Sequence, residues 1–186
     1  YGYSIQYQSQ AGDMDAVKAA FVESVKRSDR LGFDMIEVHS AHGYLLHEFL
    51  SPISNTRNDE YGGPIENRMR YPLEIFAAMR EAWPEEKPMG LRLSATDWED
   101  NGWSPEDSVV YSRALKELGC DYICASSGGI SGHTRLELGE GYQVDFASKI
   151  RREANIPTMA VGMIYDPHHS ESIVANEQAD MVALGR

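Results

Sequence analysis

The chain has 186 residues, of which 42% are hydrophobic and 25% charged, a composition typical of one folded domain with its own core. Seventeen Lys and Arg residues stand against 29 Asp and Glu residues, which gives a formal net charge of −12. This charge argues against a nucleic acid partner, because phosphate binding needs a basic surface. The apolar stretches fall far short of the about 20 residues that a membrane helix needs, so we expect no membrane partner.

The cysteine pattern gives a weak indication of the cellular compartment. Cys120 and Cys124 are separated by three residues, a spacing that fits neither a disulfide framework nor a zinc knuckle. We expect two buried thiols instead. The chain also opens without a charged-then-apolar signal sequence, and together these features favour a reducing cytoplasm.

The first elements differ from the rest of the chain. Residues 1–7 (YGYSIQY) alternate with a period of two, as a strand does, and we leave residues 1–12 without a domain assignment. Residues 13–30 carry one apolar stripe, an acidic first turn and a basic last turn, which predicts a helix. Gly32 is its stop signal.

From residue 34 a short apolar strand, a Gly- or Ser-rich turn and an amphipathic helix recur along the chain. The expected strands are 34–38, 89–94, 122–125, 158–161 and 181–184. The expected helices between them are 65–83, 105–118, 143–154 and 167–176. Pro72 should kink the first of these helices or make it start afresh.

Recurring strand–helix steps predict a parallel α/β sheet with right-handed crossovers over residues 13–186. Two architectures compete. One is an incomplete (β/α)8 barrel that holds about its last five strands, and the other is an open five-stranded sheet with helices on both faces. Periodicity alone does not choose between them. Either fold leaves unpaired sheet edges, which favour self-association into a homo-oligomer.

Both architectures bind ligands beyond the carboxyl ends of their strands. Each expected strand is followed, or ended, by polar or glycine residues that would form one rim. They are His39, His42 and Tyr44; Arg92, Ser94, Thr96 and Asp97; Ser126, Ser127, Gly128 and Gly129; Gly162 and Met163; and Gly185 and Arg186. Glycines at the last two strand ends let backbone N–H groups approach an anion, and Arg186 adds a charged fork, so a phosphate site is one interpretation.

The stretch EVHSAHGYLLHEFLSP (residues 37–52) admits three interpretations of His39 and His42. A zinc site needs further ligands, and Ser51 stands where the second histidine of a zincin helix would be, so we expect no metal. The histidines could instead cap a strand and pack beneath the next turn. Their emergence together with Tyr44 at a strand end favours a catalytic site. Neutral imidazoles can polarise a carbonyl oxygen, and a tyrosine hydroxyl can deliver a proton.

A long segment resembles a known family. HSAHGYLLHEFLSPISNTRNDEYGGPIENRMRYPLEI (residues 39–75) is similar to the signature of the Old Yellow Enzyme family, FMN-dependent NAD(P)H:flavin oxidoreductases. It resembles in particular the bacterial ene-reductases that have two histidines in the substrate site. GLRLSATDW (90–98), CASSGG (124–129), AVGMI (160–164) and ALGR (183–186) follow in the order found in the family.

The resemblance implies a function and a role for each rim residue. The activity would be reduction of the C=C bond of an α,β-unsaturated carbonyl compound, with FMN as cofactor and NADPH or NADH as reductant. His39 and His42 would hold the substrate carbonyl oxygen, and Tyr44 would protonate the α carbon. The cofactor-binding residues would be Arg92 at the pyrimidine edge of the flavin and Gly162, Met163, Gly185 and Arg186 at the phosphate.

The chain also departs from the family. Family members are about twice as long, and the strands that would precede residue 13 supply further flavin contacts that have no counterpart here. Pro64 replaces the usual serine after Tyr-Gly-Gly, a change that suits a helix start. Two alternatives therefore stand beside an active ene-reductase: a catalytically silent fragment or phosphate- or flavin-binding module, and another phosphate-binding barrel such as an isomerase.

Overall fold

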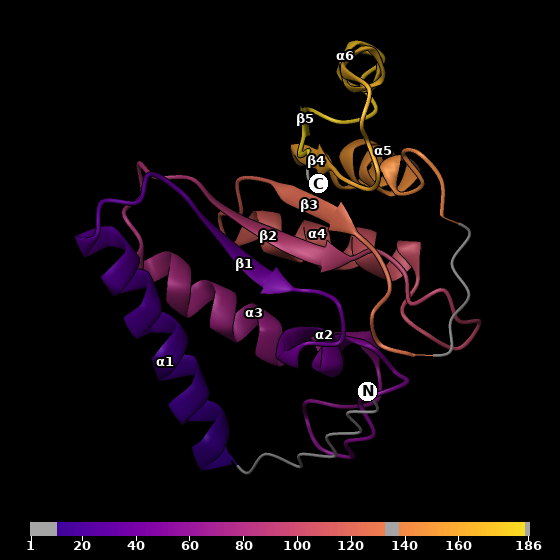
Figure 1. The fold of residues 1–186 in the computed structure, drawn as a ribbon. Coiled ribbons are helices and arrows are strands. Elements are labelled where there is room, and N and C mark those ends of the chain that lie inside the picture. Colours follow the sequence, from indigo (N-terminus) through magenta and orange to yellow (C-terminus); the bar gives the residue numbers. More distant parts are fainter. Residues whose placement is uncertain (1–10, 133–137, 185–186) are drawn as a thin grey trace.

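The computed structural model describes residues 11–132 and 138–184. Five parallel strands form one sheet in the order β1-β2-β3-β4-β5, so each strand pairs with the next strand along the chain (Figure 1). The strands are β1 (Ile36–Ser40), β2 (Met89–Ser94), β3 (Ile123–Ser126), β4 (Thr158–Ala160) and β5 (Met181–Val182). The strand-like pattern predicted for residues 1–7 lies outside the described residues.

Six helices are present in the described part of the chain. They are α1 (Ala11–Arg30), α2 (Leu45–Leu50), α3 (Ile65–Ala82), α4 (Pro105–Glu117), α5 (Val144–Ala154) and α6 (Pro167–Ala175). Local chemistry fixes several of their ends. At α4 the Ser104 side chain accepts the N–H of Asp107, and the Asp107 carboxylate accepts the N–H of Ser104, with Pro105 at the first helical position. At α6 the Asp166 carboxylate accepts the N–H of His168.

The five strands predicted from residue 34 onward and the five predicted helices are all present, with ends that shift by no more than two residues. Two further features differ from what the sequence suggested. Of the two outcomes expected at Pro72, a new helix start is excluded, because α3 runs through Pro72 as one element. Tyr71, Pro72 itself, Ile75 and Phe76 are buried, and this packing holds the helix together despite the lost hydrogen bond. The short helix α2 was not predicted, since six residues are too few for a clear apolar period.

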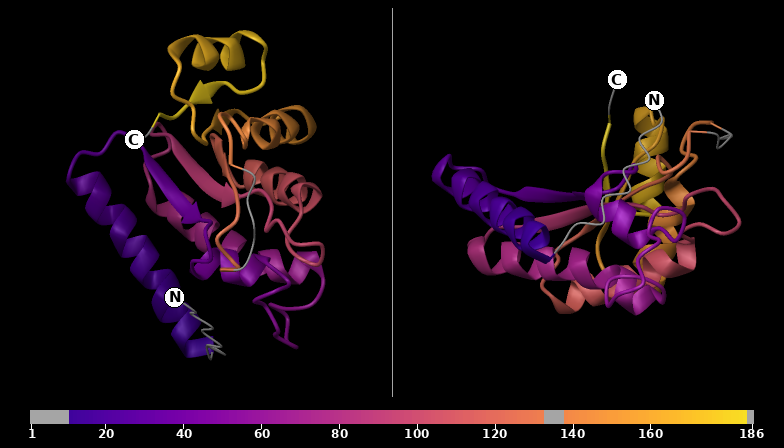
Figure 2. Two further views of the ribbon diagram at one scale, coloured as in Figure 1. Left: turned by 45° about the vertical axis from the view of Figure 1, so that its right-hand side comes forward. Right: turned by 90° about the horizontal axis from the view of Figure 1, so that it is seen from below.

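The strand order decides between the two architectures. With right-handed crossovers, consecutive parallel strands in sequential order place all their helices on the same face. Helices α3, α4 and α5 indeed lie along one side of the sheet, as Figures 1 and 2 show. The alternative of an open sheet with helices on both faces is therefore wrong, and the fold is a segment of a (β/α)8 barrel.

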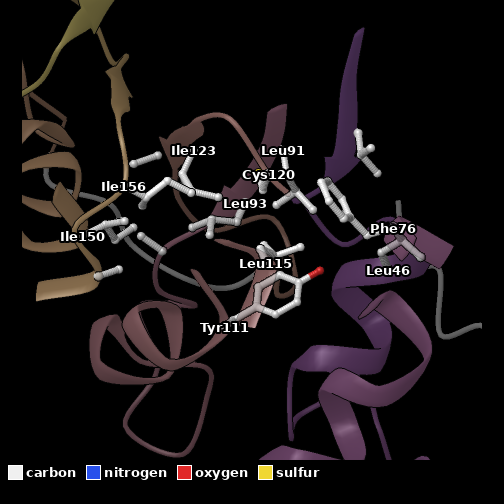
Figure 3. Packing of buried hydrophobic residues seen from close by; sticks show 14 of the residues in the cluster. Leu46, Phe76, Leu91, Leu93, Tyr111, Leu115, Cys120, Ile123, Ile150 and Ile156 are labelled. Atoms are coloured by element: carbon white, nitrogen blue, oxygen red, sulfur yellow. The ribbon is translucent and has the colours of Figure 1, made fainter. Parts of the chain in front are cut away.

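The core lies between the sheet and these helices. Leu91, Leu93, Ile123 and Ala125 point to this side of β2 and β3, and each has at most 1% of its surface exposed. Figure 3 shows Leu91, Leu93 and Ile123 near side chains of the helices, among them Phe76 of α3 and Leu115 of α4. Both cysteines are free and buried, as expected, and burial raises the pKa of each thiol to about 12.

The opposite face of the sheet carries no helix in the described residues. Its side chains alternate with the core residues along each strand, and we call this the inner face because it faces the axis in a barrel. Close to the amino ends of the strands, the ring of Tyr122 lies against Gly90, where a Cβ atom would be 2.2 Å from the ring. Glu37 of β1 also lies on this face, and burial raises the pKa of its carboxyl group.

Candidate active site

His39 lies within β1 and not after it, which corrects the predicted strand end by two residues. The backbone of β1 continues pairing to Ser40, so that His39 is in register with Arg92 of β2. The prediction ended the strand at Val38, its last apolar residue. Strand pairing depends on backbone hydrogen bonds, and a polar side chain on the inner face does not interrupt them.

His42 lies in the turn between β1 and α2, which we call the histidine loop (residues 41–44). His42 has φ = 59° and Gly43 has φ = 74°, both in the left-handed region. The N–H of His42 donates to Ser94 Oγ at 3.0 Å. A Cβ atom on Gly43 would lie 2.3 Å from the carbonyl oxygen of Gly129, so only glycine lets the loop pack on the turn after β3.

The structure brings the three predicted catalytic side chains together. The ring centroids of His39 and His42 are 5.2 Å apart, and those of His39 and Tyr44 are 5.3 Å apart in an edge arrangement. Tyr44 precedes the first residue of α2, and 64% of its surface is exposed. All three therefore lie at the carboxyl ends of the strands, where a barrel binds its ligands.

Both imidazoles are neutral at pH 7. Burial is the main cause that lowers the pKa of both histidines, and the positive charge of Arg92 is the second. The pKa of His39 lies below its usual value, and that of His42 is lowered to about 4. A neutral imidazole has one N–H donor and one bare nitrogen acceptor. The pair can therefore donate hydrogen bonds to an oxygen without adding positive charge to the site.

Ser126 at the end of β3 connects His42 to the next two strands. His42 Nε2 lies 2.7 Å from Ser126 Oγ, to which Arg92 donates at 3.4 Å. Gln143, directly before α5, accepts from Ser127 Oγ at 2.5 Å and donates to the carbonyl oxygen of Val161 at 3.3 Å. The rim is thus a continuous hydrogen-bonded edge across β1 to β4.

A cavity of about 300 Å³ follows this edge towards β5. It is lined by Arg92, Val161, Gly162, Met163, Ile164, Tyr165, Ala183 and Leu184. Gly162 has φ = 116°, and a Cβ atom there would lie 2.7 Å from Gln143 Nε2, so a side chain fits poorly. Met163 is itself left-handed, with φ = 53°. The predicted residues Gly185 and Arg186 lie outside the described residues.

Arg92 indicates which chemical groups a ligand of this cavity would carry. Its Nε atom is buried and has no hydrogen-bond partner among the residues that the structure describes. A buried N–H without an acceptor costs free energy, which a ligand oxygen or nitrogen lone pair would recover. The N–H groups of Arg92 and the turn at Gly162 thus fit the electron-rich ring edge of a flavin nucleotide.

A second polar cluster lies beneath the histidine loop and was not predicted as a unit. His47 of α2 and Asp97 after β2 are both fully buried, and His47 Nε2 lies 2.8 Å from Asp97 Oδ1. Burial alone would raise the pKa of Asp97. The hydrogen bonds from His47, Ser51 and the N–H of Trp103 outweigh it, and the pKa lies below its usual value. Asp97 was among the rim residues, but the sequence carries no sign that it meets His47.

A second cavity, of about 600 Å³, does not include the histidine pair. It lies beside Tyr44 and is lined by residues of α1, the histidine loop, α2 and the segment after α2: Asp13, Ala16, Val17, Gly43, Tyr44, Leu45, Glu48, Phe49, Ser54, Asn55 and Arg57. Its walls hold neither His39 nor Arg92. We therefore place the candidate active site at the smaller cavity and the histidine loop.

Residues 11–132 and 138–184 contain neither a metal-binding cluster nor a membrane-spanning helix. Within these ranges His, Cys, Asp and Glu form no group of three or more that could bind a metal ion. None of the helices found there has the length and apolar character required to span a bilayer.

Comparison with known proteins identifies the family to which the chain belongs. Residues 5–186 match the NADH:flavin oxidoreductase / NADH oxidase family. The chain is 48% identical over 168 residues to an NADPH dehydrogenase of Clostridium acetobutylicum, covering 90% of the chain and 49% of that protein. It is 45% identical over 166 residues to an NADPH dehydrogenase of Bacillus subtilis, covering 89% of the chain and 48% of that protein.

Solved structures give the same result for the fold. Morphinone reductase superposes with a TM-score of 0.77 at 27% identity, over 95% of this chain and 46% of that protein. An Old Yellow Enzyme homologue from Zymomonas mobilis superposes with a TM-score of 0.77 at 20% identity, over 96% of this chain and 49% of that protein. The chain spans about half the length of the relatives it matches.

The fold is thus a segment of a (β/α)8 barrel, and its sequence matches one family of oxidoreductases over residues 5–186. The chain belongs to the NADH:flavin oxidoreductase family, also known as the Old Yellow Enzyme family.

Proposed function

We propose that this chain provides the substrate-binding rim of an FMN-dependent NAD(P)H oxidoreductase that reduces the C=C bond of α,β-unsaturated carbonyl compounds. The observation that supports the proposal is the meeting of His39, His42 and Tyr44 at the same strand ends as Arg92, whose Nε atom is buried. The family membership supports FMN as the cofactor.

The two histidines bind the carbonyl oxygen of the substrate. Because both rings are neutral at pH 7, each offers an N–H donor. Arg92 donates to Ser126 Oγ, and the Ser126 hydroxyl hydrogen has two acceptors within reach: His42 Nε2 at 2.7 Å and Gln143 Oε1 at 3.4 Å. We propose that it points at the nearer one, His42 Nε2. In that arrangement the proton of His42 is on Nδ1, available to the substrate. Hydrogen bonds to this oxygen draw electron density from the β carbon and activate it for hydride addition.

Tyr44 delivers the proton to the α carbon. Its ring meets the edge of His39, and its exposed position leaves the hydroxyl group open to both substrate and solvent. General acid catalysis by a positioned hydroxyl contributes typically 10²–10⁴-fold, so about this loss of alkene reduction is expected for Tyr44→Phe.

Arg92, Gly162 and Met163 form the cofactor side of the site. Arg92 lines the cavity and has a buried Nε–H without a partner among the described residues, and its charge would stabilise negative charge on a reduced flavin ring. When bound, FMN supplies the hydride chemistry that links NAD(P)H to the alkene. Gly185 and Arg186, by family resemblance, complete the phosphate end.

Colour provides the direct test. Purified chain mixed with FMN and then desalted should retain the visible flavin absorbance, which NADPH should bleach and cyclohexenone should restore. A colourless protein after desalting would refute flavin binding by this chain.

A double variant tests the histidine roles separately. His39→Ala with His42→Ala should retain flavin and lose most of the affinity for 4-nitrophenol, whose oxygen stands in for the substrate carbonyl. Loss of folding in this variant, seen by circular dichroism, would show that the histidines support the structure instead.

A flavin-binding module without turnover is the second candidate function. The inner face of the sheet has no covering element in the described residues, and the chain spans half of its relatives. Flavin that is retained after desalting but not bleached by NADPH would favour this alternative.

A further inference from the structure

The buried pair of His47 and Asp97 is placed where it can control the active-site loop. Both side chains have 0% of their surface exposed, and they come from elements far apart in the sequence, α2 and the segment after β2. A buried carboxylate must be matched by hydrogen-bond donors, or it destabilises the fold by several kcal/mol. Asp97 has three: His47 Nε2 at 2.8 Å, Ser51 Oγ at 2.6 Å and the N–H of Trp103 at 2.7 Å.

The hydrogen bonds of His47 determine which ring nitrogen carries the proton. The backbone N–H of Gly43 donates to His47 Nδ1 at 2.9 Å, so Nδ1 must be a bare acceptor. The ring proton is then on Nε2, which points at the Asp97 carboxylate. The Asp97 carboxylate therefore keeps the ring proton of His47 on Nε2. This tautomer leaves Nδ1 able to accept the hydrogen bond from the N–H of Gly43.

Gly43 is the residue through which this pair reaches the catalytic groups. Its N–H belongs to the peptide bond that joins it to His42, whose left-handed conformation is costly for a residue with a side chain. Ser94 Oγ accepts the N–H on the other side of His42. These two bonds hold both peptide groups of His42, and a turn of either peptide would swing its imidazole away from His39.

We propose that His47 is a positioning residue for the two imidazoles: its Nδ1 atom holds the Gly43 peptide, and Asp97 keeps the proton on Nε2 so that Nδ1 can do so. The placing of the loop follows from contacts within the chain alone. The effect on ligand binding rests in addition on the function proposed above.

Two substitutions at one position separate positioning from packing. In His47→Asn the amide oxygen, bonded to Cγ as Nδ1 is, can still accept the N–H of Gly43, while the contact with Asp97 is lost. In His47→Gln the amide nitrogen reaches the position of Nε2 and still donates to Asp97, while Gly43 loses its acceptor. Both remove the ring, so a role in packing alone predicts the same result for both.

The first measurement needs no flavin. Two-bond ¹H–¹⁵N spectra of the histidine-labelled chain should show the His47 proton on Nε2. The His39 and His42 ring signals should stay near their wild-type positions in His47→Asn and move in His47→Gln. A wild-type proton on Nδ1, or equal changes in both variants, would overturn the proposal.

The second measurement is the affinity of the FMN-loaded chain for 4-nitrophenol. We expect His47→Asn to stay within about twofold of wild type and His47→Gln to bind about tenfold more weakly, the worth of one hydrogen bond. In another outcome, the wild-type chain binds neither FMN nor 4-nitrophenol, yet the His39 and His42 ring signals still differ between the two variants. This result would refute the proposed function but would still support the positioning role of His47. Binding with no difference between the variants would refute the positioning role.

His47→Asn leaves the Asp97 charge without one of its three donors and could fail to fold for that reason. The double variant His47→Asn with Asp97→Asn removes this charge. It is used in place of His47→Asn in both measurements if the single variant does not fold. Its ring signals and 4-nitrophenol affinity should again lie closer to wild type than those of His47→Gln. The reverse order would count against the proposal.

Discussion

The two faces of the sheet differ in almost every physical respect. The covered face is closed by α3, α4 and α5 and consists of apolar side chains with almost no exposed surface, such as Leu91 and Ile123. The inner face mixes charged, aromatic and imidazole groups, among them Glu37 and His39, which are exposed in β1. One face therefore holds the fold together, and we propose that the other receives the ligand.

A substitution on the covered face should have the largest effect on stability. Ile123→Ala removes a fully buried side chain between sheet and helices, and we expect a loss of about 2–5 kcal/mol in the free energy of unfolding. Met159→Ala on the inner face is the matched control on the neighbouring strand, and its loss should be clearly smaller. Urea unfolding followed by circular dichroism measures both, and equal losses would contradict the division between the faces.

A glycine on the rim should have the next largest effect. Gly129 has φ = 95°, and a Cβ atom there would lie 2.4 Å from His42 Cα, so Gly129→Ala should cost about 1–3 kcal/mol and displace the histidine loop. Gly132→Ala is the control, because a Cβ atom there meets no atom within 4 Å. The same urea experiment compares them, and the two variants should not unfold at the same concentration.

The stability of the inner face should also respond to acid. His42 has its pKa lowered to about 4, whereas an unfolded histidine binds a proton near pH 6.5. Between these pH values His42 binds a proton in the unfolded chain but not in the folded chain. The free energy of unfolding therefore falls as the pH drops from about 6.5 to 4. The loss is a fraction of the about 1.4 kcal/mol that each unit of pKa difference is worth, because the ring is only half-buried.

Urea midpoints measured across this pH range test the role of His42. His42→Gln should flatten the acid dependence, and His168→Gln, at an exposed position on α6, should leave it as in the wild type. An unchanged slope in His42→Gln would show that other groups cause the dependence.

Tyr44→Phe should have the smallest effect on stability. The side chain is 64% exposed, so the free energy of unfolding should change by no more than about 0.5 kcal/mol. A larger loss in urea unfolding would place Tyr44 among the residues that hold the fold rather than those that serve the ligand.

The same division explains what could be predicted from the sequence. The strand β2 was predicted residue for residue, because its apolar run is bounded on both sides by turn residues. The end of β1 was missed, because His39 and Ser40 are polar although their backbones still pair with β2. Apolar pattern reports the covered face well and the inner face poorly.

The site was predictable only in part for a related reason. His39, His42 and Tyr44 are neighbours in sequence, so one strand end brings them together. The pair of His47 and Asp97 joins α2 to the segment after β2. The two residues are 50 positions apart in the sequence, and no local sequence pattern predicts a contact over that separation. Such buried polar pairs become visible only when the chain is folded.

The sequential strand order has a consequence for how the chain folds. Because every strand pairs with the next one along the chain, each pairing closes only the loop formed by the helical segment between two strands. A nucleus can then form at any neighbouring pair of strands and grow in both directions, as in repeat proteins. Folding of this sheet requires no contact between its first and last strands, which favours a rapid search despite the parallel pairing.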